Sequence, residues 1–235
     1  MSSVFRFKQF EVDQGACAMK INTDGVLLGA HLYRDNLKRI LDIGTGTGVI
    51  ALMAAQLHPE AFVDAVEVDE LAYIQALSNF NKSPFNGRMR AYHSDFITFT
   101  TTDKYDLIFS NPPFYTDSLR NPDARKSLAK HSDFSFFAHM IEFVDDNLSS
   151  NGKFQCILPA ELADWVVCEL LMGRELFLSE ELSISSFEGS DIIRKIITVC
   201  RQNLEVKKNT LAIYKEKGVH SSSYKECLSP FFLAF

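Results

Sequence analysis

From Lys38 onward, short apolar runs alternate with stretches of helical periodicity. The runs expected to form strands are "RILDIG", "AFVDAVEV", "RMRAYHSD", "YDLIFS" and "KFQCILP". The helical patterns that accompany them are "TGVIALMAAQLH", "DELAYIQALSNFNKS", "SFFAHMIEFVDDNLS" and "AELADWVVCELLMG". Strands separated by helices predict right-handed βαβ units and a parallel sheet with helices on both faces. An open sheet of this kind binds its ligand at the carboxyl ends of its strands.

The last third of the chain follows a different pattern. It contains three strand-like runs with no helical pattern between them, "LFLSEELSISSF", "IRKIITVCRQ" and "NTLAIYKE". Consecutive runs of this kind predict an antiparallel end to the sheet. The sequence therefore favours an α/β fold in which a mostly parallel sheet finishes in antiparallel strands.

Composition limits the class of protein. The 235 residues are 46% hydrophobic and 23% charged, which suits one globular domain. No apolar run is long enough to cross a bilayer, and the first residues lack the apolar core of a signal peptide. The five cysteines are scattered, which is typical of reduced thiols in the cytoplasm, and the histidines show no zinc-binding spacing. We therefore expect a cytoplasmic location, no membrane contact and no structural metal.

A glycine-rich segment follows the first predicted strand. Gly44, Gly46 and Gly48 lie on a strand-to-helix turn, where glycine lets a ligand approach the backbone closely. The third glycine of a dinucleotide Gly-x-Gly-x-x-Gly motif would fall on Val49, and the Gly-Lys-Ser/Thr ending of a P-loop is missing, so NAD and ATP are disfavoured. The pattern resembles motif I of class I S-adenosylmethionine-dependent methyltransferases, in which Asp42 would end the first strand.

An acidic residue, Glu67, ends the second predicted strand. A carboxylate there can accept hydrogen bonds from both hydroxyls of a ribose, although strand-end acids are also common on protein surfaces. The resemblance implies that Val68 lies against the adenine ring of the methyl donor. It also implies that Asp95 receives the adenine amino group, or else caps a loop, and that Phe96 covers the face of the ring.

The fourth predicted strand ends in Asn111-Pro112-Pro113-Phe114. Proline fixes φ, so the prolines can hold the Pro112 carbonyl as one acceptor for an exocyclic amine, with the Asn111 side-chain oxygen as the other. Phe114 offers a face on which a flipped-out base can stack. The segment resembles the Asn-Pro-Pro-Tyr/Phe motif of amino-group methyltransferases, in which Asn111 would also border the donor; the alternative is a proline turn that ends a strand. The motif selects planar amines and does not distinguish adenine, cytosine, guanine and a glutamine amide.

The segment before the first strand narrows this choice. "CAMKINTDGVLLGA" closely resembles the bacterial valine-tRNA adenine-N6 methyltransferases, and the likeness continues through "RILDIGTGTG", "DAVEVD", "YDLIFSNPPF", "SLAKHSDFSF" and "PFFLAF". The resemblance implies S-adenosylmethionine as methyl donor and, as substrate, an adenosine beside the anticodon of a valine tRNA. It implies that Lys20, Thr23 and Asp24 border the methionine end of the donor, although Lys20 also fits a solvated strand. Phe114 stands where these proteins often carry Tyr, so it keeps the stacking face and loses a hydroxyl.

Four cations follow the Asn-Pro-Pro segment, against a single acid between Leu119 and His131. They are Arg120, Arg125, Lys126 and Lys130. In isolation such a run is typical of a solvated loop, and a net charge of −6 is unlike that of most nucleic-acid binders. Beside a base pocket, however, the run predicts contacts with tRNA phosphates. Further cations that could help are Arg194, Lys195, Lys207 and Lys208.

The resemblance implies one Rossmann-like class I methyltransferase domain over residues 1–235, with a mostly parallel seven-stranded sheet. Residues 1–37 would lie over the cofactor pocket, and residues 38–235 would form the core. Two other enzymes stay open, a protein-glutamine N5 methyltransferase and an rRNA guanine-N2 methyltransferase, although both usually carry an additional domain for which this chain has little room. A methyltransferase-like RNA-binding scaffold is the alternative without activity. We expect a monomer or a weak dimer.

Overall fold

The computed structural model describes residues 4–15, 20–113 and 126–235, with side chains for all of these except residues 126–134. Its strands are β1 (Val4–Arg6), β2 (Glu11–Asp13), β3 (Arg39–Ile43), β4 (Phe62–Glu67), β5 (Met89–His93), β6 (Tyr105–Ser110), β7 (Leu148–Pro159), β8 (Phe177–Phe187), β9 (Ile192–Cys200), β10 (Lys207–Glu216) and β11 (Val219–His220). Its helices are α1 (Thr23–Ala30), α2 (Val49–Leu57), α3 (Glu70–Lys82), α4 (Lys126–Asn147), α5 (Ala160–Trp165) and α6 (Ser222–Leu228), with a 3-10 turn η1 (Asn86–Arg88) and a π-helical turn η3 (Val166–Leu170). No helix in this part of the chain combines the length and the apolar character that a membrane span requires.

A nine-stranded mixed sheet organises the described residues, in the order β11-β10-β8-β9-β7-β6-β3-β4-β5. The strands from β5 through β7 in this order run parallel to one another. β9 runs antiparallel to both β7 and β8. The predicted mostly parallel sheet with an antiparallel C-terminal pair is therefore confirmed. It is wider than the seven strands expected, because β10 pairs with β8 and β11 folds back antiparallel on β10. The third C-terminal run, β10, was expected in an antiparallel end of the sheet, but it runs parallel to β8.

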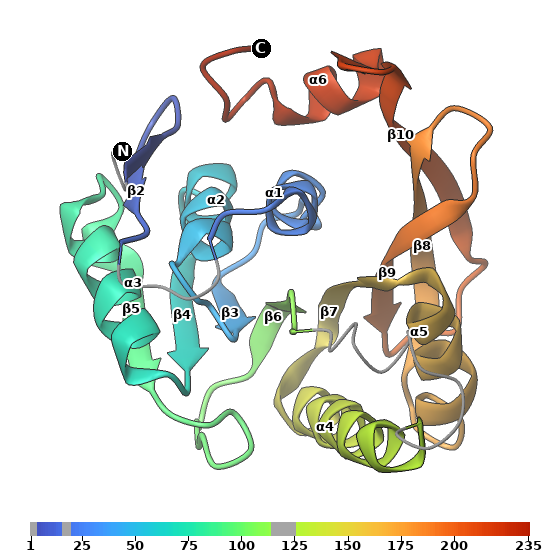
Figure 1. Ribbon diagram of the computed structural model, residues 1–235. Coiled ribbons are helices and arrows are strands. Elements are labelled where there is room, and N and C mark those ends of the chain that lie inside the picture. Colours follow the sequence, from blue (N-terminus) through green and yellow to red (C-terminus); the bar gives the residue numbers. More distant parts are fainter. Residues whose placement is uncertain (1–3, 16–19, 114–125) are drawn as a thin grey trace.

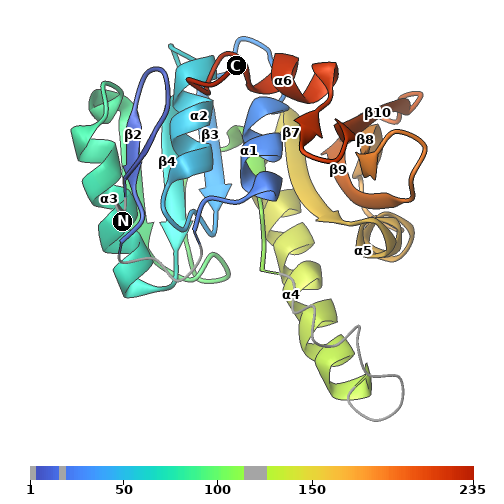
Figure 2. The same ribbon diagram turned by 45° about the horizontal axis from the view of Figure 1, so that its top comes forward.

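Helices cover both faces of the sheet (Figure 1). α1, α2, α3 and α6 lie on one face, where Leu27, Leu52, Phe80 and Leu228 belong to one buried cluster. α4 and α5 lie on the other face, where Met140 belongs to a second cluster. The amino-terminal half of α4 extends away from the sheet (Figure 2). This layering buries both faces and leaves the carboxyl ends of the central strands for a site.

The direction of chain progression reverses at β3, which has β4 on one side and β6 on the other. The register places Ile43 opposite both Val66 and Ser110. The Ser110 hydroxyl donates a 2.9 Å hydrogen bond to the Ile43 carbonyl, which fastens the ends of β6 and β3 together. The glycine turn, the acid that ends β4 and the Asn-Pro-Pro segment therefore meet at the switch point where open α/β sheets bind ligands.

Side-chain caps fix the start of the two helices that border this edge. The Asp69 carboxylate accepts a 2.8 Å hydrogen bond from the Ala72 N–H, so Asp69 caps α3. The Asn22 side-chain oxygen accepts a bond of the same length from the Gly25 N–H, so Asn22 caps α1. Each cap satisfies one of the backbone donors that a helix leaves unpaired at its amino end.

The two ends of the described chain lie side by side. Phe7 pairs with Phe232 in an antiparallel bridge, and their rings meet edge to face at 5.6 Å. The Lys8 ammonium donates hydrogen bonds to the carbonyls of Ser229, at 2.5 Å, and Phe235, at 3.1 Å. These contacts hold the β1–β2 hairpin against the segment that follows α6.

We expect alanine substitutions at Gly44 and Gly48 to lower the free energy of unfolding by different amounts. Gly44 and Gly48 have φ values of 72° and 81°, where a Cβ costs about 1–2 kcal/mol. A Cβ on Gly48 would also lie 2.5 Å from Phe80 Cε1, whereas a Cβ on Gly44 would meet nothing within 4 Å. Overpacking typically costs about 1–3 kcal/mol, so Gly48→Ala should lower the free energy of unfolding by about that much more than Gly44→Ala. Urea denaturation measures both variants, and equal losses would show that the Phe80 ring gives way without cost.

Candidate active site

The turn between β3 and α2 forms an open backbone cradle. Gly44, Gly46 and Gly48 all adopt positive φ, at 72°, 56° and 81°. Open space adjoins the first two, because a Cβ on either would meet nothing within 4 Å. Gly48 instead packs against Phe80 of α3. The turn thus has one side for a ligand and one side for the core.

Glu67 holds this turn in place from the end of β4. Its Oε2 accepts a 2.8 Å hydrogen bond from the Gly46 N–H. Its Oε1 accepts bonds of 2.9 Å and 3.0 Å from the N–H groups of Val68 and Asp69. A carboxylate has about four acceptor positions, and these bonds occupy three of them. The carboxylate predicted to bind a ribose therefore also builds the site, and Oε2 keeps one acceptor position for a ligand hydroxyl.

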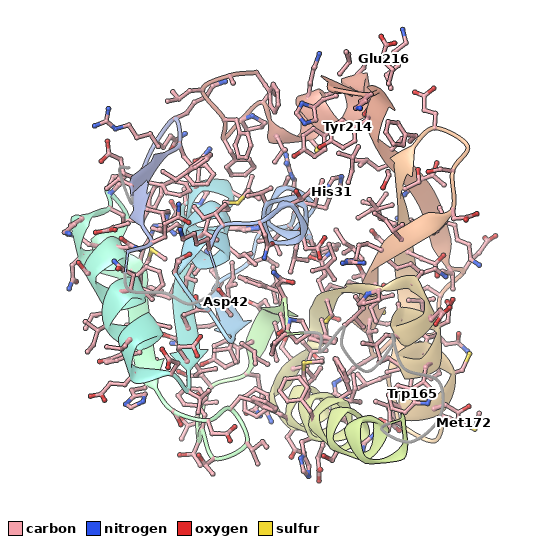
Figure 3. The ribbon with its side chains drawn as sticks, in the orientation of Figure 1. His31, Asp42, Trp165, Met172, Tyr214 and Glu216 are labelled. Carbon is pink, nitrogen blue, oxygen red and sulfur yellow. The ribbon has the colours of Figure 1, made fainter. Side chains whose placement is uncertain are left out.

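Asp42 lies in the interior beneath the cradle (Figure 3). Its Oδ2 accepts a 2.7 Å hydrogen bond from the Thr45 hydroxyl, while the buried Oδ1 has no partner among the described residues. Burial raises the pKa of the Asp42 carboxyl from 3.8 to about 7; the bond from Thr45 opposes this shift and the charge of Glu67 reinforces it. A positively charged ligand placed beside Asp42 would favour its ionised form.

The residues expected around an adenine ring divide into two groups. Val68 is 66% exposed just after the end of β4, so its side chain offers apolar surface to a ligand. Asp95 is exposed, and its carboxylate accepts a 3.0 Å bond from the Ile97 N–H, which is the loop cap considered as the alternative for this residue. Phe96 is only 8% exposed, because its ring packs edge to face on Phe136. The burial of Phe96 argues against the predicted contact with the face of the adenine ring. The neighbouring side chain of Ile97 is 50% exposed and offers more surface for that contact.

The Asn-Pro-Pro segment leaves β6 beside the first turn of α1. Asn111 is half-buried, Pro112 is buried and Pro113 is exposed. A Cβ placed on Gly25 would lie 3.4 Å from Asn111 Nδ2, so the Asn111 amide packs closely against α1. Phe114 lies outside the described residues.

The polar and charged residues predicted to bind the donor or tRNA differ in their exposure and in their partners. Lys20 and Thr23 are exposed before and at the start of α1. The Asp24 carboxylate forms an ion pair with Arg194, at 2.8 Å. Lys195 pairs with Asp164, at 2.6 Å, and with Glu181, at 3.3 Å, so acids already compensate its charge. The side chains of Arg120, Arg125, Lys126 and Lys130 lie outside the described part of the chain.

Asn79 of α3 is a site-building residue that the sequence did not reveal. Its Oδ1 accepts a 3.0 Å bond from the Asp13 N–H, and its Nδ2 donates bonds of 2.8 Å to the carbonyls of Asp13 and Thr47. The amide thus joins the end of β2 to the glycine turn. Next to it, the Gln14 side chain accepts a 3.0 Å bond from the Ile21 N–H. The only signal in the sequence is an Asn inside a helical pattern, where its helix propensity is poor.

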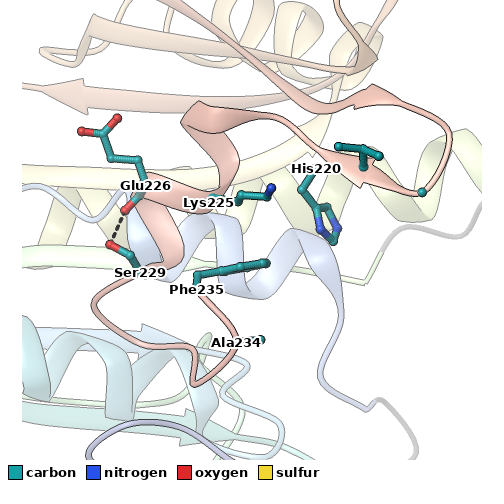
Figure 4. A pocket seen from close by; sticks show the side chains of 8 residues that line it. His220, Lys225, Glu226, Ser229, Ala234 and Phe235 are labelled. Atoms are coloured by element: carbon teal, nitrogen blue, oxygen red, sulfur yellow. Dashed lines mark hydrogen bonds between the residues drawn. The ribbon is translucent and has the colours of Figure 1, made fainter.

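A cavity of about 580 Å³ lies elsewhere in the molecule, between β11, α6 and the residues that follow α6 (Figure 4). Lys225 and Phe235 line it together with His220, whose ring stacks on Tyr224 at 4.6 Å. None of the residues predicted for the donor or the base belongs to its lining. The switch-point edge of the sheet is therefore the candidate active site.

Comparison with solved structures supports the fold. A predicted O-methyltransferase from Agrobacterium tumefaciens aligns over 88% of this chain and 96% of its own, with a TM-score of 0.67 and 17% identity. A ribosomal protein L11 methylase from Lactobacillus delbrueckii subsp. bulgaricus aligns over 82% and 84%, with a TM-score of 0.58 and 16% identity. Residues 11–163 also match the family model described as "Methyltransferase small domain". With its glycine cradle and Asn-Pro-Pro segment, the chain is therefore a class I methyltransferase.

Full-length relatives narrow the class to one family. A tRNA1(Val) (adenine(37)-N6)-methyltransferase from Pedobacter heparinus is 46% identical over 235 residues, which is 100% of both chains. The chain belongs to this family of tRNA1(Val) (adenine(37)-N6)-methyltransferases. Relatives of the same name from Bacteroides thetaiotaomicron and Christiangramia forsetii are 38% and 36% identical, each over 97% of both chains.

The raised pKa of Asp42 predicts a pH-dependent effect of Asp42→Asn. Because the folded pKa of about 7 exceeds the ordinary 3.8, the folded protein retains a proton that the unfolded chain releases between these values. The contribution of Asp42 to wild-type stability therefore falls as pH rises through this window and is constant above it. Asn cannot ionise, so Asp42→Asn should gain stability relative to wild type between about pH 4 and about pH 7. Urea denaturation across this range measures the gain, and a difference independent of pH would contradict the assignment.

Proposed function

We propose that the protein methylates the exocyclic N6 amine of adenine 37 in tRNA1(Val). Two observations support this substrate: full-length relatives of that name at 36–46% identity, and the Asn111-Pro112-Pro113 segment beside the glycine cradle. The Asn-Pro-Pro segment is the observation that indicates methylation of an amine, because it offers fixed hydrogen-bond acceptors to a planar amino group. A tRNA substrate suits a cytoplasmic enzyme.

S-adenosylmethionine fits the cradle as methyl donor. The open space beside Gly44 and Gly46 is a feature that a ligand close to the backbone would use. When bound, this donor supplies an electrophilic methyl group on a positively charged sulfur. The remaining acceptor position of Glu67 Oε2 would bind a ribose hydroxyl. Asp42 would stabilise positive charge, since a nearby cation favours its ionised form.

The outer parts of the donor would contact residues at the two rims of the cradle. Val68 and Ile97 provide exposed apolar surface for the adenine ring, and Asp95 provides a carboxylate for its amino group. Lys20 and Thr23 would border the methionine end. Residues 1–37 would then cover the pocket within a single domain of residues 1–235, which the bonds of Asn79 to β2 and to the glycine turn support.

The acceptor amine would lie between Asn111 and Pro112. Its two N–H groups would donate hydrogen bonds to the Asn111 side-chain oxygen and the Pro112 carbonyl, which draws the nitrogen lone pair out of conjugation with the ring. Pro113 stiffens this carbonyl position, because proline fixes φ. Phe114 would stack on the flipped-out base, a contact typically worth about 1–3 kcal/mol. The rest of the work is positioning for an in-line displacement.

Product analysis tests the function directly. The protein is incubated with labelled donor and total tRNA from a strain that lacks this gene, and the tRNA is digested to nucleosides. We expect N6-methyladenosine, mapped to position 37 of tRNA1(Val). Asn111→Ala should lose about a hundredfold or more in turnover while S-adenosylhomocysteine binding is retained, since Asn111 acts on the amine. Asn36→Ala, which changes an exposed amide in the loop before β3, is the matched control.

Other products would overturn the proposal in identifiable ways. N2-methylguanosine would favour the rRNA guanine-N2 alternative, and label confined to protein would favour the glutamine N5 alternative. Donor binding without any methylated product would favour the RNA-binding scaffold. Loss of donor affinity in Asn111→Ala would contradict the role given to Asn111.

We also propose that Arg120, Arg125, Lys126 and Lys130 contact tRNA phosphates. Each phosphate contact contributes about 0.7–0.9 to the slope of log affinity against log salt. The double variant Arg125→Ala/Lys126→Ala should therefore weaken tRNA binding and reduce that slope by about 1.5. Lys215→Ala/Lys217→Ala, on the exposed β10–β11 hairpin, removes the same charge elsewhere as a control. An unchanged slope in the first variant, or an equal change in both, would refute the contact.

A further inference from the structure

The ion pair between Asp24 and Arg194 joins two residues that the sequence assigned to different ligands. Asp24 was expected at the methionine end of the donor, and Arg194 on tRNA phosphate. In the structure Arg194 Nε lies 2.8 Å from Asp24 Oδ2, and the two side chains are only 27% and 22% exposed. The pair is thus half-buried, and it links residues that are 170 positions apart in the chain.

The position of Arg194 on β9 shows which elements the ion pair joins. Arg194 lies on β9 opposite Pro159, the last residue of β7. Since β7 lies between β9 and β6, the Arg194 side chain reaches α1 at the same edge of the sheet from which Asn111 leaves β6. The first turn of α1 therefore contacts β9 through this ion pair and the end of β6 through Asn111, two strands on the same side of β3.

The next residue after Asp24 faces the catalytic segment. A Cβ on Gly25 would lie 3.4 Å from Asn111 Nδ2 and equally far from Asn22 Oδ1, the cap of α1. The same Asn22 oxygen accepts the hydrogen bond from the Gly25 N–H. A shift of this turn by a few tenths of an ångström would therefore move the backbone against which the Asn111 amide packs.

Electrostatics favours this arrangement over a direct role of Asp24 in donor binding. A carboxylate in the first turn of a helix is stabilised by the helix dipole, and Arg194 supplies its counter-charge. Because a guanidinium already compensates its charge, Asp24 is less available to the positive charge of a donor.

We propose that the Asp24–Arg194 pair is a positioning element that fixes the first turn of α1, and through it the orientation of the Asn111 amide toward the acceptor amine. The proposal rests on the function proposed above. Neither residue touches the reacting atoms, so the pair acts on turnover and leaves the affinity for the donor almost unchanged. In-line transfer is sensitive to misplacement of this kind, with a loss of up to about a hundredfold for a shift of about 1 Å.

The test separates turnover, donor affinity and folding. Arg194→Ala and Asp24→Asn should each lower kcat for tRNA methylation about tenfold or more, while the Kd for S-adenosylhomocysteine, measured by calorimetry, changes by less than about twofold. The double variant should be no worse than either single variant, because both remove the same contact. Arg194→Lys should recover part of kcat, since it restores the charge without the planar fork of arginine.

Arg201 offers a matched control at the other end of β9. Its guanidinium pairs with Asp145 at 2.8 Å, with side-chain exposures of 24% and 28%, away from the switch-point edge. Arg201→Ala should lower the Tm at least as much as Arg194→Ala and leave kcat unchanged. Equal kcat losses in both variants would reduce the Asp24–Arg194 pair to a general stabilising contact.

Two further outcomes would overturn the proposal. A loss of donor affinity in Asp24→Asn without one in Arg194→Ala would mean that Asp24 binds the donor itself. Unchanged kcat in Asp24→Asn and in Arg194→Ala would mean that the first turn of α1 keeps its position without the ion pair. Failure of the proposed function is recognised separately, because the wild-type protein would then yield no N6-methyladenosine in the same assay.

Discussion

One carboxylate, that of Glu67, holds the switch-point edge together. It accepts hydrogen bonds from the N–H groups of Gly46, Val68 and Asp69, and so ties the turn after β3 to the turn after β4. Hydrogen bonds to a charged acceptor contribute about 1.5–3 kcal/mol each, which helps to hold a turn with left-handed glycines at three alternate positions. The cradle, the start of α3 and the alignment of two strand ends all depend on this one anion. The protein's own backbone donors therefore hold this carboxylate and the turn around it.

Around this anion, the edge divides its chemistry between two neighbouring strand ends. The β3–β4 side carries the cradle and Asp42, whose buried oxygen has no partner in the described chain. The β6 side carries Asn111 and Pro112, held at the end of the strand by the bond from Ser110 to Ile43. In the proposed function, donor and acceptor groups would therefore approach from different turns, which follow two strands that lie side by side.

The sequence predicted what short-range patterns determine. The alternation of strands and helices predicted the parallel sheet, and the absence of helical patterns in the last third predicted its antiparallel end. The glycine turn is a local signal with a local cause, and its prediction was correct. Gly44, Gly46 and Asn111 come to the same edge because they follow neighbouring parallel strands.

The sequence could not predict which side chains meet across the fold. The resemblance implied that Asp24 borders the donor, and Arg194 was a further cation that could contact tRNA phosphates, yet the two pair with each other across 170 positions of the chain. Phe96 follows a strand as an adenine contact would, yet the hydrophobic cluster under α4 buries its ring. The linking role of Asn79 depends on a contact with β2 that no periodic pattern records. In each case the deciding partner is distant in the chain, so local spacing carries no information about it.

The contact between the two ends of the described chain has a consequence for the order of folding. The hydrogen bond from Lys8 to the Phe235 carbonyl closes a loop between residues 227 positions apart, and closure entropy makes such long-range contacts form late. The β1–β2 hairpin that this bond secures also carries Asp13, whose backbone Asn79 binds, and leads to Gln14, which holds Ile21. The sheet and its glycine turn can therefore assemble first, as a scaffold with one side open. The contacts that Asn79 makes with Asp13, and that Gln14 makes with Ile21, would then form late in folding.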